Sequence, residues 1–104
     1  MSDIAQVEET IKRISSHKGV KGSMIINGDG IAIRTTMSNE DTVQHAALIS
    51  RFTEKARSCV RATGEEDELQ FVRVRSKKHE IIIAPSFESN QVYYLVVIQD
   101  PSTQ

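Results

Sequence analysis

Two runs of consecutive apolar residues constrain the fold of this chain more than any other feature of its sequence. Residues 81–83 are three isoleucines, and residues 92–98 are apolar throughout. Successive side chains of a β-strand point to opposite faces of a sheet, so such runs are typical of strands covered on both faces. The 12 isoleucines and nine valines, against three leucines, also favour a sheet over a helix bundle. The chain must therefore build a sheet and cover both of its sides.

The rest of the sequence predicts two helices and three further strands. Apolar residues spaced three and four apart indicate amphipathic helices, and alternating patterns between glycine-rich links indicate strands. The predicted elements, in chain order, are a helix over residues 4–17, strands over 20–27 and 31–36, a helix from Ser38 or Asn39 to about 62, and strands over 69–75, 80–84 and 92–99. Pro85 is expected to end the fourth strand, because it has no N–H for a ladder hydrogen bond. This order predicts a single α+β domain over residues 1–104 with a five-stranded antiparallel sheet.

Two helices are too few to cover such a sheet. Five strands make a sheet about 24 Å wide, whereas a helix covers about 10 Å of it. The apolar stripe of the second helix also spans about 160°, which is too wide for one contact surface. Phe52, the only aromatic residue of that helix, is expected to anchor it. Both deficits predict that the fold is completed by association with a second copy or with another chain.

Composition excludes several classes of function. The 13 basic and 14 acidic residues give a net charge of −1, so no overall field attracts nucleic acid or an anionic membrane. Cys59 is the only cysteine, which excludes an internal disulfide and a multi-cysteine zinc site and favours a cytosolic protein. The three histidines fall on different predicted elements, and no nucleophile elbow or Walker lysine motif is present. We therefore expect no catalytic activity, no cofactor and no bound metal.

One dense basic cluster remains, at the end of the third strand and in the turn after it: Arg73, Arg75, Lys77, Lys78 and His79. It can be a docking surface for an acidic partner. It can equally be a solvated hairpin whose charges prevent other strands from pairing with its edge. The sequence leaves both interpretations open.

At the level of motifs, the chain resembles the roadblock family of dynein light chains over nearly its whole length. The matching segments are residues 7–14 (VEETIKRI), 17–20 (HKGV), 55–58 (KARS), 71–81 (FVRVRSKKHEI), 84–85 (AP) and 95–101 (LVVIQDP). The resemblance implies a homodimer in which the third strands pair across a two-fold axis and the second helices pack together over a continuous ten-stranded sheet. The dimer interface would then include Leu48, Ile49, Phe52, Ala56, Leu69, Phe71, Val72, Arg73 and Val74.

The resemblance also implies a function, that of a non-catalytic light chain that binds the dynein intermediate chain in microtubule-based transport. Its setting would be the cytoplasmic, microtubule-associated dynein complex or an axoneme, with other dynein light chains as further partners. We expect the partner to bind through Ile4, Val7, Arg73, Arg75, Lys77 and Lys78. Related roadblock-like proteins instead act as scaffolds or regulators of small GTPases, which is the alternative function. An enzyme is a third class, which the absence of a convergent acid, base or nucleophile set disfavours.

Overall fold

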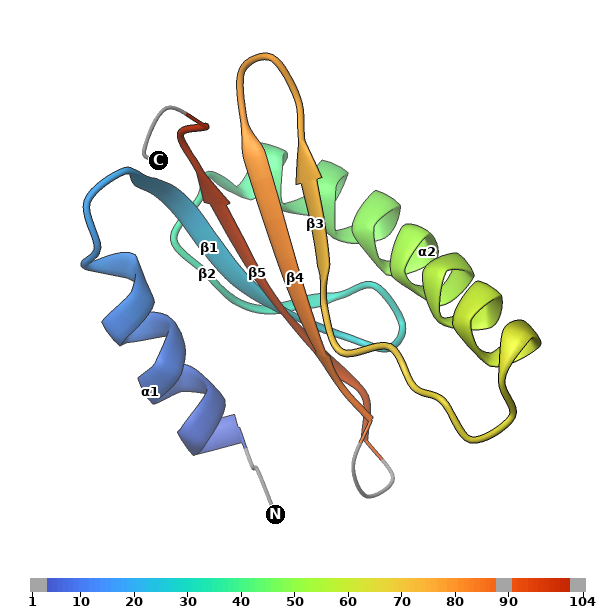
Figure 1. Ribbon diagram of the computed structural model, residues 1–104. Helices are drawn as coiled ribbons and strands as arrows, with labels where there is room; N and C mark the ends of the chain where they lie inside the picture. Colours follow the sequence, from blue (N-terminus) through green and yellow to red (C-terminus); the bar gives the residue numbers. More distant parts are fainter. Residues whose placement is uncertain (1–3, 88–90, 102–104) are drawn as a thin grey trace.

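The five strands that the structure describes join one antiparallel sheet, with one helix on each face (Figure 1). The computed structural model describes residues 4–87 and 91–101. Its elements are α1 (Ile4–Ser15), β1 (Val20–Asn27), β2 (Ala32–Thr35), α2 (Asn39–Thr63), β3 (Val72–Arg75), β4 (Glu80–Ser86) and β5 (Tyr93–Gln99). The strand order is β2-β1-β5-β4-β3. The predicted α+β class and five-stranded antiparallel sheet are confirmed.

The core lies where β1, β5 and β4 run side by side at the centre of the sheet. Met24 of β1 stands opposite Val96 of β5, which in turn stands opposite Ile83 of β4, and all three are buried against α2. The alternate residues Ile25 and Val97 point to the opposite face, toward α1, and are buried too. The apolar runs of the sequence are therefore strands with partly or fully buried residues on both faces, as predicted.

The helix α2 begins at a defined cap and packs through small side chains. The Ser38 hydroxyl accepts a hydrogen bond from the Asp41 backbone N–H at 3.1 Å, so Ser38 rather than Asn39 is the cap. The buried side chains of the helix are Thr42, Ala46, Ile49, Ser50 and Thr53. The Thr53 hydroxyl donates to the Ile49 carbonyl at 2.8 Å, which satisfies a polar group inside the core. Small residues let the helix approach the sheet closely.

The prediction that Phe52 anchors α2 is wrong for the single chain. Its side chain remains 47% exposed, because it lies to one side of the buried row that Ala46, Ile49 and Thr53 form. The wide apolar stripe of α2 thus divides into a buried part, which contacts the sheet of its own chain, and an exposed part.

The bounds of two predicted strands are also wrong, and Pro85 accounts for both. β4 continues through Pro85, which stands opposite Tyr94 of β5. Proline is tolerated there because the pairing between β3 and β4 stops at Val72 and Ile83, so no described strand needs a hydrogen bond from the other side of Pro85. The strand predicted over residues 69–75 begins only at Val72, because a longer ladder would soon bring it opposite Pro85, which cannot donate a hydrogen bond.

We expect Ile83→Ala to lower the free energy of unfolding by about 2–5 kcal/mol, because its side chain is 1% exposed and its removal leaves a cavity in the core. Ile31→Ala is the matched control, because that isoleucine is 61% exposed and its truncation should change stability by less than about 0.5 kcal/mol. Urea denaturation of both variants at one protein concentration measures the difference. Equal losses in the two variants would contradict the assignment of the core.

Candidate functional site

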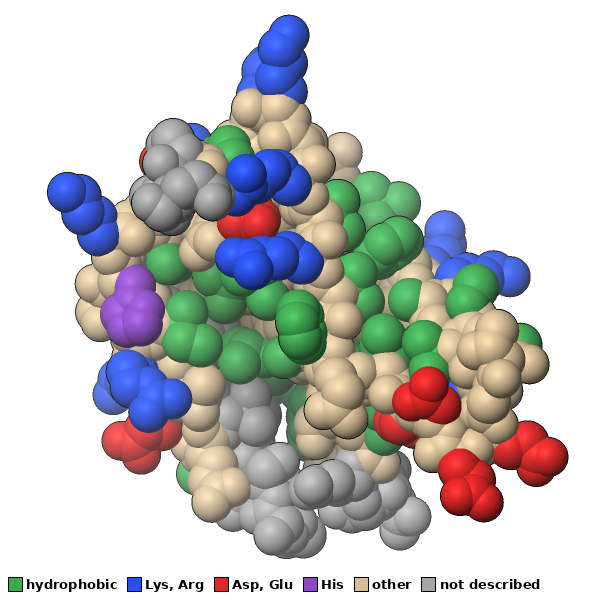
Figure 2. Space-filling view, viewed as in Figure 1, with side chains coloured by type: hydrophobic (Ala, Val, Ile, Leu, Met, Phe, Trp, Pro, Cys, Tyr) green, Lys and Arg blue, Asp and Glu red, His purple; other side chains and the backbone are tan. Residues whose placement is uncertain are grey.

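The first candidate surface is the edge of the sheet at β3. Within the described residues β3 pairs with β4 alone, so its other edge presents backbone N–H and C=O groups to solvent. Val72 packs against the core cluster beneath α2, and Val74 lies on the same face but is exposed. Leu48 and Phe52 of α2 are exposed as well, and Figure 2 shows hydrophobic side chains along α2 beside β3. A strand edge that hydrogen bonds can extend therefore lies next to an apolar helix surface.

The nine residues predicted for the dimer interface do not all lie on this surface. Exposed residues are Leu48, Phe52, Phe71, Arg73 and Val74; Ala56, Leu69 and Val72 are partly buried, and Ile49 is buried. Ile49 belongs to the core of its own chain, and its place in a dimer interface stays a prediction. Leu69 and Phe71 lie in the segment that precedes β3 rather than within the strand.

The second candidate surface is the face of the sheet that carries α1. An ion pair between Glu8 of α1 and Arg34 of β2, with 2.6 Å between Glu8 Oε2 and Arg34 Nε, ties the helix to one side of the sheet. Beyond the helix an open groove of about 480 Å³ lies between α1 and strands β4 and β5 (Figure 2). It is lined by Gln6, Glu9, Thr10, Arg13, Ala84, Pro85, Ser86, Tyr93 and Leu95. α1 thus leaves part of this face uncovered, as the width of the sheet predicts.

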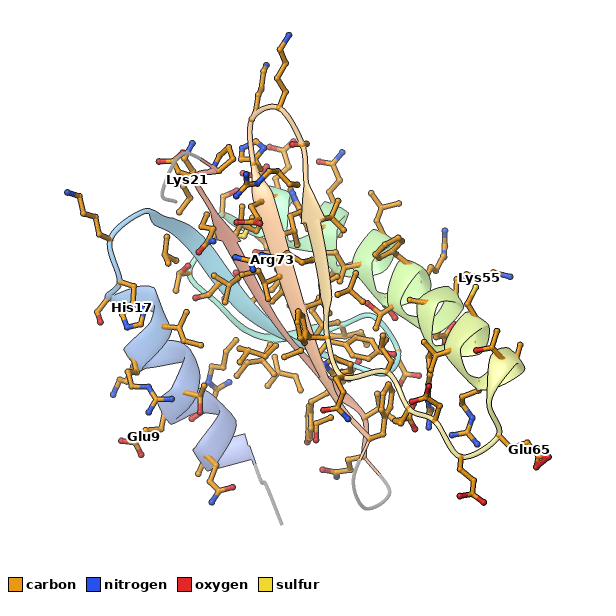
Figure 3. All side chains as sticks on the ribbon, in the orientation of Figure 1. Glu9, His17, Lys21, Lys55, Glu65 and Arg73 are labelled. Carbon is orange, nitrogen blue, oxygen red and sulfur yellow. The ribbon has the colours of Figure 1, made fainter. Side chains whose placement is uncertain are left out.

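A buried carboxylate organises the charges on that face. Glu80 of β4 is 3% exposed and accepts hydrogen bonds from Arg73 Nε at 2.8 Å and from Gln99 Nε2 at 2.9 Å, with Arg75 Nε at 3.6 Å (Figure 3). The hydrogen bond from Gln99, and then that from Arg73, lower the pKa of Glu80 although burial opposes them. One acid therefore fixes the positions of two half-exposed arginines.

Sequence reasoning missed Glu80 and Gln99 as parts of this cluster. The available signal was the tight turn between β3 and β4, which places Arg75 directly opposite Glu80. The turn itself is held by the Ser76 backbone N–H, which donates to the His79 carbonyl at 2.7 Å. Lys77 and Lys78 both lie exposed in the turn. The two arginines therefore lie over the sheet, whereas the lysines lie at the tip of the hairpin.

The remaining predicted partner residues are Ile4 and Val7. Both belong to α1, but the structure does not describe their side chains. They stay predictions. Among the described residues there is no group of three or more His, Cys, Asp or Glu that could hold a metal ion. Over the same residues, no helix combines the length and the apolar character needed to cross a bilayer.

Within the described residues the sheet has two edge strands, β2 and β3, and one partly uncovered face, which leaves surfaces where another chain can bind. A family model for the Roadblock/LC7 domain matches residues 6–99, and the chain belongs to that family. Members of the family generally act as non-catalytic scaffolds or regulators. The resemblance that the motifs indicate is thus confirmed at the level of the family.

Solved structures share this fold at low sequence identity. The Roadblock/LC7 domain from Streptomyces avermitilis has a TM-score of 0.76 and 16% identity, covering 97% of this chain and 81% of its own. MglB of Myxococcus xanthus has a TM-score of 0.75 and 18% identity, covering 99% and 82%. An MglB structure described as a tetrameric arrangement has a TM-score of 0.74 and 12% identity, covering 96% and 76%. At these identities the likeness shows the fold alone.

If the exposed stripe of α2 is an interface between copies, Phe52→Ala should raise the dissociation constant of a dimer by about 10- to 100-fold, because a large aromatic anchor is lost. Val43→Ala truncates an exposed side chain on a different side of the same helix and should leave the constant unchanged. Sedimentation equilibrium of both variants measures the constants. An unchanged constant for Phe52→Ala would exclude that part of α2 from the interface.

We expect Glu80→Gln to destabilise the protein at pH 7 and this difference to shrink as the pH falls. A glutamate with a lowered pKa contributes stability above its ordinary pKa, and the contribution is lost as the pH falls through the lowered value. Thermal unfolding of both proteins between pH 7 and pH 3 tests this. Glu9→Gln, at an exposed position on α1, serves as the control. A constant difference across the whole range would contradict the role of the Glu80 charge.

Proposed function

We propose that this chain is a non-catalytic adaptor that works as a homodimer, with β3 paired to β3 of a second copy in a continuous ten-stranded sheet. The observation that carries the proposal is the open edge of β3 beside exposed Leu48, Phe52 and Val74. Pairing two such edges would satisfy the backbone groups of both strands and bury the apolar surface of α2 in one step. The description of one MglB structure as a tetrameric arrangement supports association of copies in this fold.

Dimer formation would turn the uncovered part of each sheet face into one broad trough. The six central strands, three from each copy, span about 29 Å between the two α1 helices. The floor would be apolar, with Ala84 and Leu95 of each copy, and Arg73 and Arg75 would lie near the two-fold axis. An amphipathic helix fits this trough, with its apolar side on the sheet and acidic residues toward the arginines. Apolar contact would supply most of the affinity, and charge would set orientation and association rate.

The sequence motifs support the dynein intermediate chain as the partner that supplies this helix. With that partner, the protein would act in the cytoplasm as a light chain of a microtubule-associated motor, assisting assembly and cargo attachment. Ile4 and Val7 would then contribute from α1. Lys77 and Lys78, which we also predict from the sequence to bind the partner, lie at the hairpin tip rather than over the trough, so Arg73 and Arg75 are the stronger candidates.

A small GTPase is the second candidate partner, with the chain as its scaffold or regulator. The comparisons favour this alternative over the dynein role, because the three structures described above are bacterial-type roadblock and MglB proteins and none is named as a dynein subunit. The same dimer would serve either partner, so the architecture alone does not separate the two functions.

Capture experiments separate the two partners. The purified dimer is immobilised and offered an intermediate-chain segment, or a panel of small GTPases loaded with GDP or with a non-hydrolysable GTP analogue. Binding of the segment without any GTPase supports the motor function, and nucleotide-dependent binding of a GTPase supports the alternative. Binding of neither would contradict the adaptor proposal.

For the partner that is captured, we expect the double variant Arg73→Gln and Arg75→Gln to slow association by about 3- to 10-fold at low salt, with a weaker salt dependence and a smaller change in dissociation rate. Lys12→Gln and Lys18→Gln remove the same charge from exposed positions at α1 and serve as the control. Stopped-flow or surface-binding kinetics at 50 and 500 mM salt measure the rates. An unchanged association rate would place the docking surface elsewhere.

A further inference from the structure

Opposite charges stand at the two ends of β3. The turn after the strand carries Lys77 and Lys78, and the loop before it carries Glu65 and Glu66, all of them exposed. Figure 2 shows basic side chains at the end of the molecule where the β3–β4 hairpin projects and acidic side chains near the end of α2, where Figure 3 labels Glu65. Within one chain these groups lie too far apart along the strand to form a pair.

Both charged segments are held in place by contacts of their own. The carboxylate of Glu68 accepts two hydrogen bonds from Arg57, each 2.8 Å long, and one from Arg61 at 3.2 Å. The Asp67 backbone N–H donates to the Gly64 carbonyl at 2.9 Å, which closes the loop. Glu68 is thus paired within its own chain, whereas Glu65 and Glu66 at the start of the loop are exposed to solvent.

The hairpin tip is ordered in a similar way. The Ser76 hydroxyl accepts hydrogen bonds from the backbone N–H groups of Lys78 at 3.3 Å and His79 at 3.1 Å. A charged turn and a charged loop that are both fixed lose little conformational freedom when they meet a partner. They are therefore suited to contact each other if a second copy brings them together.

Antiparallel pairing of β3 with itself would bring them together. In an antiparallel ladder the numbers of paired residues have a constant sum, so full overlap of the strand sets Val72 opposite Arg75 of the second copy. Beyond the paired strands, the turn with Lys77 and Lys78 of one copy then lies on the same side as the segment before β3 of the second copy, which leads back to the acidic loop. The two-fold axis repeats the contact at the other end of the strand pair.

We propose that the lysines of each hairpin tip pair in trans with Glu65 and Glu66 of a second copy, and that this pairing selects the second copy over other strands at the open β3 edge. The proposal rests on the homodimer put forward above. Lysines near an edge repel strands that lack compensating charge. A strand that follows an acidic loop can pair with this edge, because the loop compensates the charge of the lysines. Only the antiparallel direction is allowed, because a parallel arrangement would set lysines against lysines.

Charge reversal at the two ends separately, followed by mixing, tests the pairing. One variant carries Lys77→Glu and Lys78→Glu, and the other carries Glu65→Lys and Glu66→Lys. Each alone sets like charges against each other at both ends of the strand pair, so its homodimer should dissociate with a constant about 10- to 100-fold above that of the wild type. Mixed in equal amounts, they should form a heterodimer within about threefold of the wild-type constant, because both ends become complementary again. Native mass spectrometry resolves the species.

The control is the double variant Lys12→Glu and Lys18→Glu, which makes the same change in net charge as the lysine variant but on α1 and in the turn after it, away from β3, and should dimerise like the wild type. The pairing would be overturned if either charge-reversed variant, measured alone, dimerised like this control. It would also be overturned if the mixture of the two dimerised as weakly as each variant alone. Either result would leave the homodimer intact. A wild-type chain that stays monomeric up to 100 μM would instead contradict the proposed function itself. The weakening should also diminish in 0.5 M salt, since exposed charges are screened there.

Discussion

The structure depends on β4 and β5 being apolar on both faces. A sheet with such strands at its centre must be covered twice, yet the chain supplies one helix for each face. α2 covers one face of the sheet, and α1 covers part of the other, where the ion pair between Glu8 and Arg34 holds it. What the helices leave uncovered is the β3 edge, the outer stripe of α2 and the groove beside α1. The candidate binding surfaces are thus direct consequences of a deficit in the number of helices.

Much of this could be predicted from the sequence, and the errors share a cause. The strand runs, the glycine-rich link between the first two strands and a helix cap at Ser38 or Asn39 depend on local patterns, which the sequence displays directly. The predictions for Phe52 and Pro85 are wrong because the surroundings of both residues depend on elements that lie far from them along the chain. Which part of a wide apolar stripe faces the sheet depends on helix rotation, and whether a proline ends a strand depends on where its neighbouring strand stops.

The candidate site was harder to predict than the fold. The basic residues were evident, but the role of Glu80 required the hairpin register and the presence of Gln99 on β5, a third strand. Helical periodicity also cannot distinguish residues of α2 that contact the sheet of their own chain, such as Ile49, from residues that would contact a second copy. The acidic loop gives no functional signal in the sequence, because its glutamates would meet a partner only if β3 pairs with another β3.

Glu80 shows how a binding surface can carry charge without losing stability. Two arginines at the edge strand would repel each other and would repel the same pair in a second copy near the two-fold axis. A buried carboxylate between them, further fixed by an amide from β5, lowers that repulsion and holds both side chains over the sheet. Among the described residues, Glu80 forms ion pairs with Arg73 and Arg75 and not with the lysines of the turn. The positive charge of Arg73 and Arg75 is therefore partly balanced within its own chain, whereas the charge of Lys77 and Lys78 at the hairpin tip stays exposed to solvent.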